Sequence, residues 1–254
     1  MERAAATPRP EPSDTDELAP VNERLQQASL DEIVSWCARH YGESACLATS
    51  FGPQSILLME RVARLAPQTV VFYLDTGLLF PETYALRDEL TRRLGLRIVR
   101  VAPELTPHEQ EGVHGPALWA RDPDRCCRMR KVQPLARFLA GRRAWITGIR
   151  RAQTTARARA QVVEWDATHG LVKINPLTHW SHAEVWAELR RRDLPFNPLH
   201  LAGYPSIGCQ PCTRSVRPGE DPRSGRWPDS AKTECGIHHP APGSLPGGLT
   251  GKCA

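Results

Sequence analysis

The fold is decided by the stretch from Ala45 to Leu74, which reads ACLATSFGPQSILLMERVARLAPQTVVFYL. Its first five residues, Ala45–Thr49, form a short apolar run that is typical of a buried strand. A polar loop then leads into Ser55–Leu65, whose apolar residues recur at helical spacing, and Thr69–Leu74 is a second apolar run. A strand, a helix and a second strand in this order predict a crossover unit with two parallel strands.

The same alternation continues along the chain. We expect helices over residues 30–41, Pro81–Leu94, Cys127–Leu139 and Ser181–Arg192, and strands over Arg97–Val101 and Ala144–Thr147. Together these elements predict an α/β fold, a parallel twisted sheet with helices on both faces. Because such sheets bind ligands beyond the carboxyl ends of their strands, we expect the functional site at that edge.

The two ends of the chain differ in composition from its middle. Residues 1–28 are rich in Pro, Ala and acidic residues without periodicity, which predicts a disordered N-terminal tail. From Pro195 onward Pro and Gly are frequent and the regular patterns end. We therefore expect one domain over residues 29–213 and an irregular, mobile C-terminal tail over residues 214–254.

The net charge of +5 is unevenly distributed, because residues 1–32 hold three of the 33 basic and eight of the 28 acidic residues. The remaining body is strongly basic, which suits an anionic small substrate or a nucleic acid, and composition does not choose between them. The longest uncharged stretches, residues 44–59 and 194–213, are broken by polar residues and do not resemble a bilayer span of roughly 20 apolar residues. Since no secretory signal is evident, we expect a cytoplasmic protein without disulfides or membrane contact.

Two loops at the ends of predicted strands carry polar residues. Ser50–Ser55 leads from a strand into a helix, where backbone N–H groups receive phosphates, although Ser and Gly also cap helices without any ligand. Leu74–Gly77, which reads LDTG, follows the second strand, and Pro81 suits the first position of the next helix. Asp75 either caps this turn or contacts a ligand.

Four of the eight cysteines form two pairs. Cys126 and Cys127 are adjacent, and Cys209 and Cys212 form a Cys-x-x-Cys pair about eighty residues later. Four thiolates match either a zinc ion or an iron–sulfur cluster, and unligated thiols are the third alternative. Adjacent side chains on a helix diverge by roughly 100°, which suits the separated irons of a cluster better than one tetrahedral ion.

The other cysteines differ in their surroundings. Cys235 is flanked by a lysine and a histidine, an electropositive setting that favours the nucleophilic thiolate. Cys253 fits a free cysteine near the terminus. Cys37 and Cys46 lie on apolar faces, so we expect both in the core.

Taken together, these segments resemble the assimilatory adenylylsulfate reductases of the phosphoadenylylsulfate reductase family. The matching strings lie in the family's order between residues 45 and 239 and are Thr49–Gly52, Leu74–Gly77, Phe80–Thr83, Cys126–Val132, Trp145–Gln153, Lys173–Leu177, Gly203–Thr213, Gly219–Trp227 and Lys232–His238. Cys-Cys, Cys-x-x-Cys and Glu-Cys-Gly-x-His strings rarely coincide elsewhere. One departure is a shorter segment after Gln153.

The resemblance implies an adenine nucleotide alpha hydrolase-like fold and the thioredoxin-dependent reduction of adenosine 5′-phosphosulfate to sulfite and AMP, in sulfate assimilation and cysteine biosynthesis. It implies that Cys235, on the mobile tail, is the catalytic nucleophile and forms an S-sulfonate. The implied ligands of one four-iron four-sulfur (4Fe-4S) cluster are Cys126, Cys127, Cys209 and Cys212. The residues implied in substrate binding are Ser50, Lys131, Thr147, Gly148, Arg157, Arg223, Arg226 and His238. The resemblance implies no nucleic-acid partner and leaves a homo-oligomer open.

Three other functions stay open. ATP-cleaving enzymes such as tRNA-thiolating adenylyltransferases share the fold, but Ser50–Ser55 lacks the paired glycines and the aspartate of their Ser-Gly-Gly-x-Asp-Ser loop. An iron–sulfur regulatory DNA-binding protein fits the basic body, although no helix-turn-helix pattern is evident and such a protein would not need Cys235. Reduction of 3′-phosphoadenylylsulfate, alone or as a second substrate, is the third. Enzymes restricted to that nucleotide typically lack the four cluster cysteines, so we favour the unphosphorylated substrate.

Overall fold

The computed structural model describes residues 13–238. Its centre is a six-stranded sheet with the order β3-β2-β1-β4-β6-β5, in which every neighbouring pair is parallel except β5 and β6. The strands are β1 (Ala45–Thr49), β2 (Val70–Leu74), β3 (Ile98–Val101), β4 (Ala144–Ile146), β5 (Val163–Asp166) and β6 (Leu171–Ile174). The predicted α/β fold is therefore confirmed, and the sheet is parallel as predicted except at β5.

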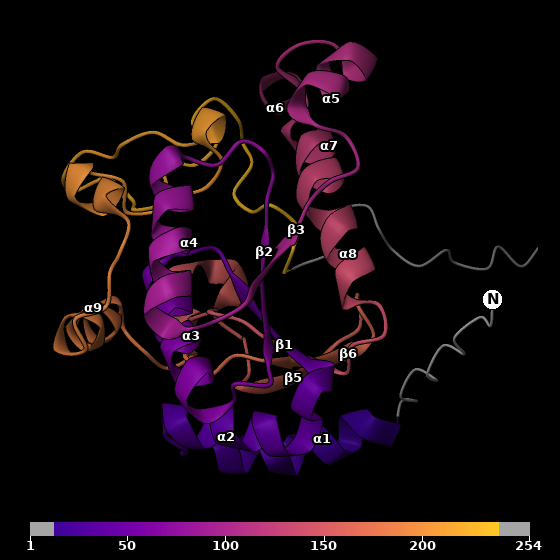
Figure 1. Ribbon diagram of the computed structural model, residues 1–254, viewed down its shortest axis with the longest axis vertical. Coiled ribbons are helices and arrows are strands. Elements are labelled where there is room, and N and C mark those ends of the chain that lie inside the picture. The colour runs from indigo at the N-terminus through magenta and orange to yellow at the C-terminus, as the bar shows by residue number, and fades with distance from the viewer. Residues whose placement is uncertain (1–12, 239–254) are drawn as a thin grey trace, which may run out of the picture.

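Helices pack on both faces of this sheet (Figure 1). The α-helices are α1 (Ser13–Leu25), α2 (Leu30–Tyr41), α3 (Pro53–Leu65), α4 (Pro81–Leu94), α5 (Pro107–His114), α6 (Leu118–Arg121), α7 (Pro123–Cys127), α8 (Gln133–Leu139) and α9 (His182–Arg191). One core cluster joins α2, α3, α4 and α9 to one face of the sheet. A second, smaller cluster joins α8 to the other face.

Alternate residues of β1 explain these two clusters. Leu47 packs in the larger cluster and Cys46 in the smaller one, because successive side chains of a strand point to opposite faces. Both are completely buried, as is Cys37 on α2. The prediction that Cys37 and Cys46 lie in the core is confirmed, and burial raises the pKa of each thiol to about 12.

The expectation of a tail without structure over residues 1–28 is wrong for its second half. Residues 13–25 form α1, which packs along the edge strand β5. Leu25 is buried in the core, and the Asn22 side chain bonds both to the Val163 N–H (3.1 Å) and to Gln161 (3.0 Å). Tertiary packing against β5 stabilises this helix despite an internal proline at position 20. Residues 1–12 lie outside the described part of the chain.

The predicted helix over Cys127–Leu139 contains an irregular turn. The helical segment begins at Pro123, and a π-helical turn, Arg128–Val132, joins α7 to α8. Pro134 has no N–H to donate and its ring crowds the carbonyl four residues earlier, so a widened turn relieves the conflict. The antiparallel pair of β5 and β6 was not expected from the sequence.

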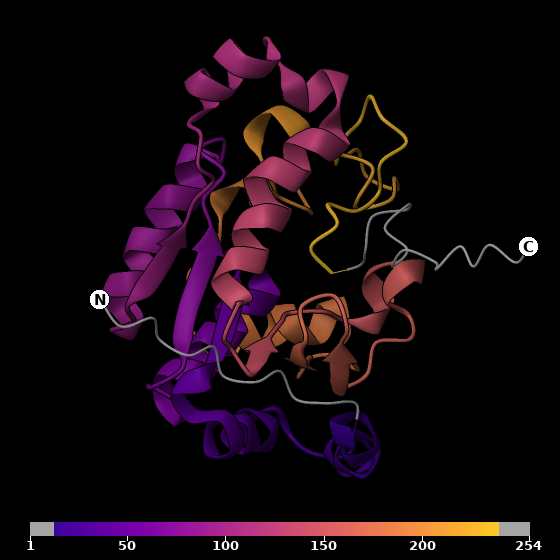
Figure 2. The same cartoon turned by 90° about the vertical axis from the view of Figure 1, so that its right-hand side faces the viewer.

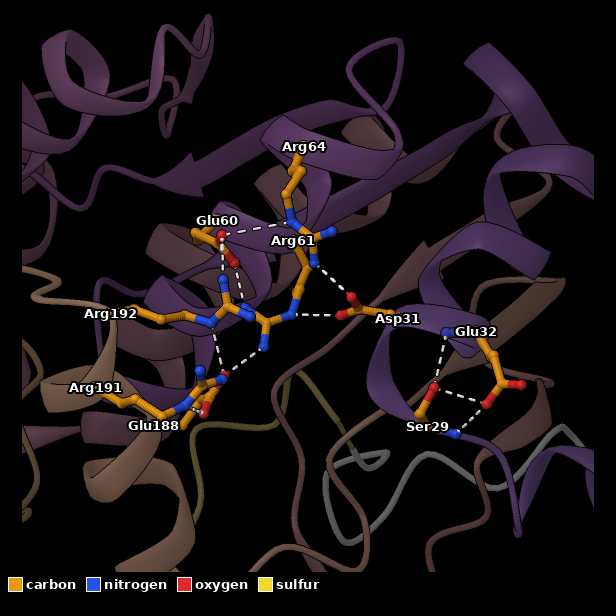
Figure 3. Close-up of polar contacts among 9 residues, drawn as sticks. All are labelled: Ser29, Asp31, Glu32, Glu60, Arg61, Arg64, Glu188, Arg191 and Arg192. Atoms are coloured by element: carbon orange, nitrogen blue, oxygen red, sulfur yellow. Dashed lines mark hydrogen bonds and ion pairs between the residues drawn. The ribbon is translucent and has the colours of Figure 1, made fainter.

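A network of ion pairs holds α2, α3 and α9 together (Figure 3). At its centre is Arg61, which is 3% exposed and pairs with Asp31 (2.6 Å), Glu60 and Glu188 (2.6 Å). Arg192 bonds both Glu188 (2.6 Å) and Glu60 (2.9 Å). The buried guanidinium therefore has carboxylates from three helices around it, as a buried charge requires.

Within residues 13–238 we find no helix with the length and apolar character needed to cross a membrane.

Candidate active site

A cavity of about 650 Å³ lies at the carboxyl edge of the sheet. Its walls include the residues that directly follow β1 and β4, the two neighbouring strands at which the strand order reverses. Ligands of open α/β sheets bind at such a reversal point. The volume also falls within the roughly 300–1,000 Å³ that is typical of small-molecule sites.

The loop after β1 and the first residues of α3 line this cavity. Phe51 adopts a left-handed conformation (φ 57°), stabilised by a bond from its N–H to the Thr49 hydroxyl (3.0 Å) and by packing of its ring against Tyr73. This turn places Gly52 and the start of α3 at the cavity wall, where no described side chain caps the helix. An uncapped N-terminus of a 13-residue helix favours an anion such as a phosphate.

The loop after β4 forms the opposite side of the same crevice. The Thr147 hydroxyl donates to the Asn175 side chain (2.5 Å) and accepts from the Ile149 N–H (3.3 Å), so its rotamer is determined by the fold. Gly148 lies against α3, and a Cβ there would come within 3.1 Å of the Gln54 side chain. A residue larger than glycine at position 148 would therefore require Gln54 at the start of α3 to shift.

Five cationic side chains line the cavity, namely Lys131, Arg150, Arg157, Arg223 and Arg226. Two of them, Arg157 and Arg223, form ion pairs with Glu234 (2.9 and 3.3 Å). The other three have no carboxylate within ion-pair distance among residues 13–238, and Arg150 is only 4% exposed. Cations that burial leaves uncompensated create a positive potential that suits an anionic ligand.

The C-terminal segment, residues 214–238, completes the cavity with Cys235 and His238. It lies alongside α7, where Lys232 pairs with Asp124 (Figure 2, yellow). Cys235 is half-buried and lines the cavity, while the His238 ring stacks on Trp145 with a centroid distance of 5.4 Å. The candidate nucleophile therefore lies in the same cavity as the cationic side chains.

The four cysteines of the two pairs line a second, small cavity, which shares Lys131 and Trp227 with the larger one. Cys127, Cys209 and Cys212 belong to one buried cluster with Trp227, and Cys126 lines the same small cavity. The Thr76 hydroxyl lies 3.3 Å from the Cys209 sulfur. Burial raises the pKa of Cys127 to about 11 and that of Cys212 to about 12.

Arg130 and Lys131 bring positive charge to these cysteines. Arg130 is 2% exposed, donates to the Thr76 carbonyl (2.6 Å) and to Gln110 (2.9 Å), and has no ion-pair partner among residues 13–238. Lys131 lines both the cysteine cavity and the larger cavity. Within the same part of the chain, no group of three or more His, Cys, Asp or Glu side chains has the arrangement that a single metal ion requires.

Asp75 is a structural residue rather than part of the cavity wall. Its carboxylate accepts from the Gly77 N–H (2.9 Å), the Tyr84 hydroxyl (2.7 Å) and Arg100 (2.5 Å). Burial alone would raise the pKa of Asp75, but the bonds from Arg100 and Tyr84 lower it below its usual value. Of the two interpretations that the sequence left open, the local cap describes this geometry.

The structure brings the predicted site residues together. The proposed nucleophile and all eight proposed substrate-binding residues line the 650 Å³ cavity, and these are Cys235, Ser50, Lys131, Thr147, Gly148, Arg157, Arg223, Arg226 and His238. Sequence reasoning assigned no role to Arg150 or Glu234, which also line it. Both residues lie inside strings that match the family, and this match could have identified them as candidate site residues. Cys253 lies outside the described residues.

Comparison with known proteins identifies relatives of this chain. Residues 44–215 match the family model described as the phosphoadenosine phosphosulfate reductase domain. An adenosine 5′-phosphosulfate reductase of Salinibacter ruber is 47% identical over 222 residues, which cover 87% of this chain and 88% of that protein. A phosphoadenosine 5′-phosphosulfate reductase of Gloeobacter violaceus is 47% identical over 211 residues, covering 82% and 88%.

Solved structures support the same comparison. A phosphoadenylyl-sulfate reductase from Candida auris, crystallised as a phosphate complex, has a TM-score of 0.70 at 27% identity and covers 83% of this chain and 100% of that chain. A Candida glabrata FMN adenylyltransferase has a TM-score of 0.54 at 13% identity, covering 94% and 88%. The second similarity concerns the fold alone.

Proposed function

Because this chain belongs to the phosphoadenosine phosphosulfate reductase family, we propose that it reduces adenosine 5′-phosphosulfate to sulfite and AMP. The observation that carries this proposal is the position of Cys235 in one cavity with five cationic side chains and the uncapped start of α3. The unphosphorylated nucleotide is favoured because relatives named adenosine 5′-phosphosulfate reductase are 41–47% identical to this chain. The Gloeobacter relative makes the 3′-phosphorylated nucleotide the second candidate.

The proposed reaction has two steps at Cys235. Its thiolate attacks the sulfur of the phosphosulfate, an S–S bond forms as the bridging S–O bond breaks, and AMP leaves with the electron pair. The product is a Cys235 S-sulfonate. A thiolate of thioredoxin then attacks the Cys235 sulfur, sulfite leaves, and the second thiol of thioredoxin resolves the mixed disulfide. The two electrons come from thioredoxin, and the thiols require a reducing compartment such as the cytoplasm.

The first step brings an anion to a polyanion, so cations must neutralise the substrate. We assign Lys131, Arg223 and Arg226 to the phosphosulfate, together with His238 from the same segment as Cys235. All four line the cavity. Prearranged charges of this kind stabilise the charge that develops on the leaving phosphate and hold the reacting atoms in line.

The nucleotide part would lie along the crevice between β1 and β4. Ser50 at the start of the α3 loop, Thr147 and Gly148 are the residues that we assign to it, with Arg157 beside them. On this side of the cavity Gly148 approaches Gln54 closely.

We further propose that Cys126, Cys127, Cys209 and Cys212 hold one 4Fe-4S cluster. The residues fit such a group, because four buried thiols adjoin two cations, Arg130 and Lys131, that lack a carboxylate partner among the described residues. Cluster-bound thiolates would supply the compensating negative charge. The cluster would contribute structure and charge, since the chemistry above needs no electrons from it.

The test is incubation of the anaerobically purified protein with adenosine 5′-phosphosulfate and no reductant. Intact mass should show one added SO₃ group, mapped to Cys235 and removed by thioredoxin with release of sulfite. The Cys235→Ser variant should show neither adduct nor turnover, while its iron and sulfide contents match the wild type. A serine variant that retains turnover would mean that another group is the nucleophile.

A parallel assay with the 3′-phosphorylated nucleotide decides between the two substrates. Equal rates of sulfite release from both nucleotides would make this a dual-substrate enzyme. Stoichiometric zinc without iron in the anaerobic protein would show that the cluster assignment is wrong.

A further inference from the structure

Glu234 places a carboxylate in the wall of the basic cavity. Its Oε2 accepts from Arg157 Nη2 at 2.9 Å and lies 3.3 Å from Arg223 Nη2. Its Oε1 lies 3.5 Å from the Thr154 hydroxyl. The Glu234 side chain is only 16% exposed, so this contact is well shielded from water.

The contact joins two separate parts of the molecule. Arg157 belongs to a short 3-10 helix, Thr155–Arg157, in the body of the domain, whereas Arg223 and Glu234 belong to the C-terminal segment. Arg223 also donates to the carbonyl of Thr233 (2.8 Å), so it stays close to the backbone next to Glu234. Glu234 directly precedes Cys235 in the chain.

Two guanidinium groups around one carboxylate form an anion-binding arrangement. Guanidinium groups bind carboxylates, phosphates and sulfates with the same planar, charge-assisted hydrogen bonds. A phosphate or sulfate group that reaches Arg157 and Arg223 therefore has to compete with Glu234. Asp221, the other acidic residue that lines the cavity within residues 13–238, accepts from the backbone N–H of Arg223 and lies outside ion-pair distance of both guanidinium groups.

We propose that Glu234 is a built-in competitor for an anionic group of the nucleotide. The carboxylate binds Arg157 and Arg223 until the phosphosulfate displaces it, and it binds them again as AMP leaves. Glu234 thereby sets the affinity for the nucleotide and links its arrival to a displacement beside Cys235. The identity of the nucleotide rests on the proposed function.

The test measures binding of adenosine 5′-phosphosulfate by calorimetry in a Cys235→Ser background, where no adduct forms. Adding Glu234→Gln should tighten binding about tenfold, the effect of removing one competing charge-assisted contact. Adenosine, which has no anionic group, should bind both proteins equally. The matched control is Asp229→Asn, because Asp229 is exposed on the same segment and its loss changes the net charge equally.

Weaker or unchanged binding of the phosphosulfate to the Glu234→Gln protein would overturn the proposal. That result is expected if the Glu234 carboxylate only holds the C-terminal segment against Arg157. The Glu234→Ala variant repeats the binding measurement without an amide that could itself bond the two arginines. Its binding is compared with that of the parent protein after both are shown to melt at the same temperature. The two failures are distinguishable. Tighter binding by the Glu234 variants with no sulfite release by the wild type would leave this inference standing and remove the proposed function. Sulfite release by the wild type, with unchanged binding by the Glu234 variants, would support the proposed function and overturn this inference.

Discussion

Arg61 is the residue whose replacement should most clearly show how the helices are held on the sheet. In Arg61→Met the side chain keeps a similar length and loses its charge, so the ion pairs to Asp31 and Glu188 disappear. Removing one partner of a buried ion pair costs about 3–5 kcal/mol. We expect about 3 kcal/mol, because Glu188 keeps Arg192 and Asp31 keeps Arg64 (2.5 Å) as partners.

The assay is urea denaturation of the anaerobic protein, accompanied by thermal melting. A loss of about 3 kcal/mol should lower the melting temperature by about 6–12 °C in a domain of this size. The control is Arg93→Met, which removes an exposed pair with Asp193 (95% exposed side chain) and should cost less than about 1 kcal/mol. Equal losses in the two variants would refute the reasoning that burial makes the Arg61 network important.

Four further outcomes are expected. The hydrogen bond from Arg191, with those from Arg192 and Arg61, lowers the pKa of Glu188 to about 2. The contribution of Glu188 to stability is therefore present above pH 4.5 and is lost as the pH falls toward 2. In the Glu188→Gln variant the free energy of unfolding should depend less on pH in this range. Cys209→Ser should lose the brown chromophore of the anaerobic protein and unfold at a lower temperature, and retention of full iron would contradict the ligand assignment. Arg226→Ala should weaken binding of adenosine 5′-phosphosulfate by about 1.5–3 kcal/mol and leave adenosine binding unchanged; equal losses for both would place Arg226 at the nucleoside. Trypsin should cut the segment around Arg226 more slowly in Cys235→Ser protein saturated with the phosphosulfate than in the free protein, and equal rates would exclude a closing segment.

Local pattern was sufficient for the central part of the fold. The apolar runs of β1 and β2 are buried on both faces, so their sequence alone predicts interior strands. The helix between them, which has apolar residues at regular spacing, predicts a parallel crossover. Pattern was insufficient for α1 and β5. Their stability depends on each other, through contacts such as Asn22 with Val163, and neither segment carries a strong signal alone.

The candidate site divides in the same way. Residue types and spacing in the sequence pointed to Cys235, to the two cysteine pairs and to a basic anion site, because thiols and clustered cations have few other uses in such strings. Only the tertiary structure decided how the charges are balanced. Asp75 forms an ion pair with Arg100 and Glu234 with Arg157 and Arg223, whereas Arg150 is buried and has no carboxylate partner in the part of the chain that the structure describes. The pairing of Arg157 with Glu234 joins residues that are 77 positions apart in the chain. Because electrostatic interaction depends on distance and burial in space, the sequence pattern does not reveal such pairings.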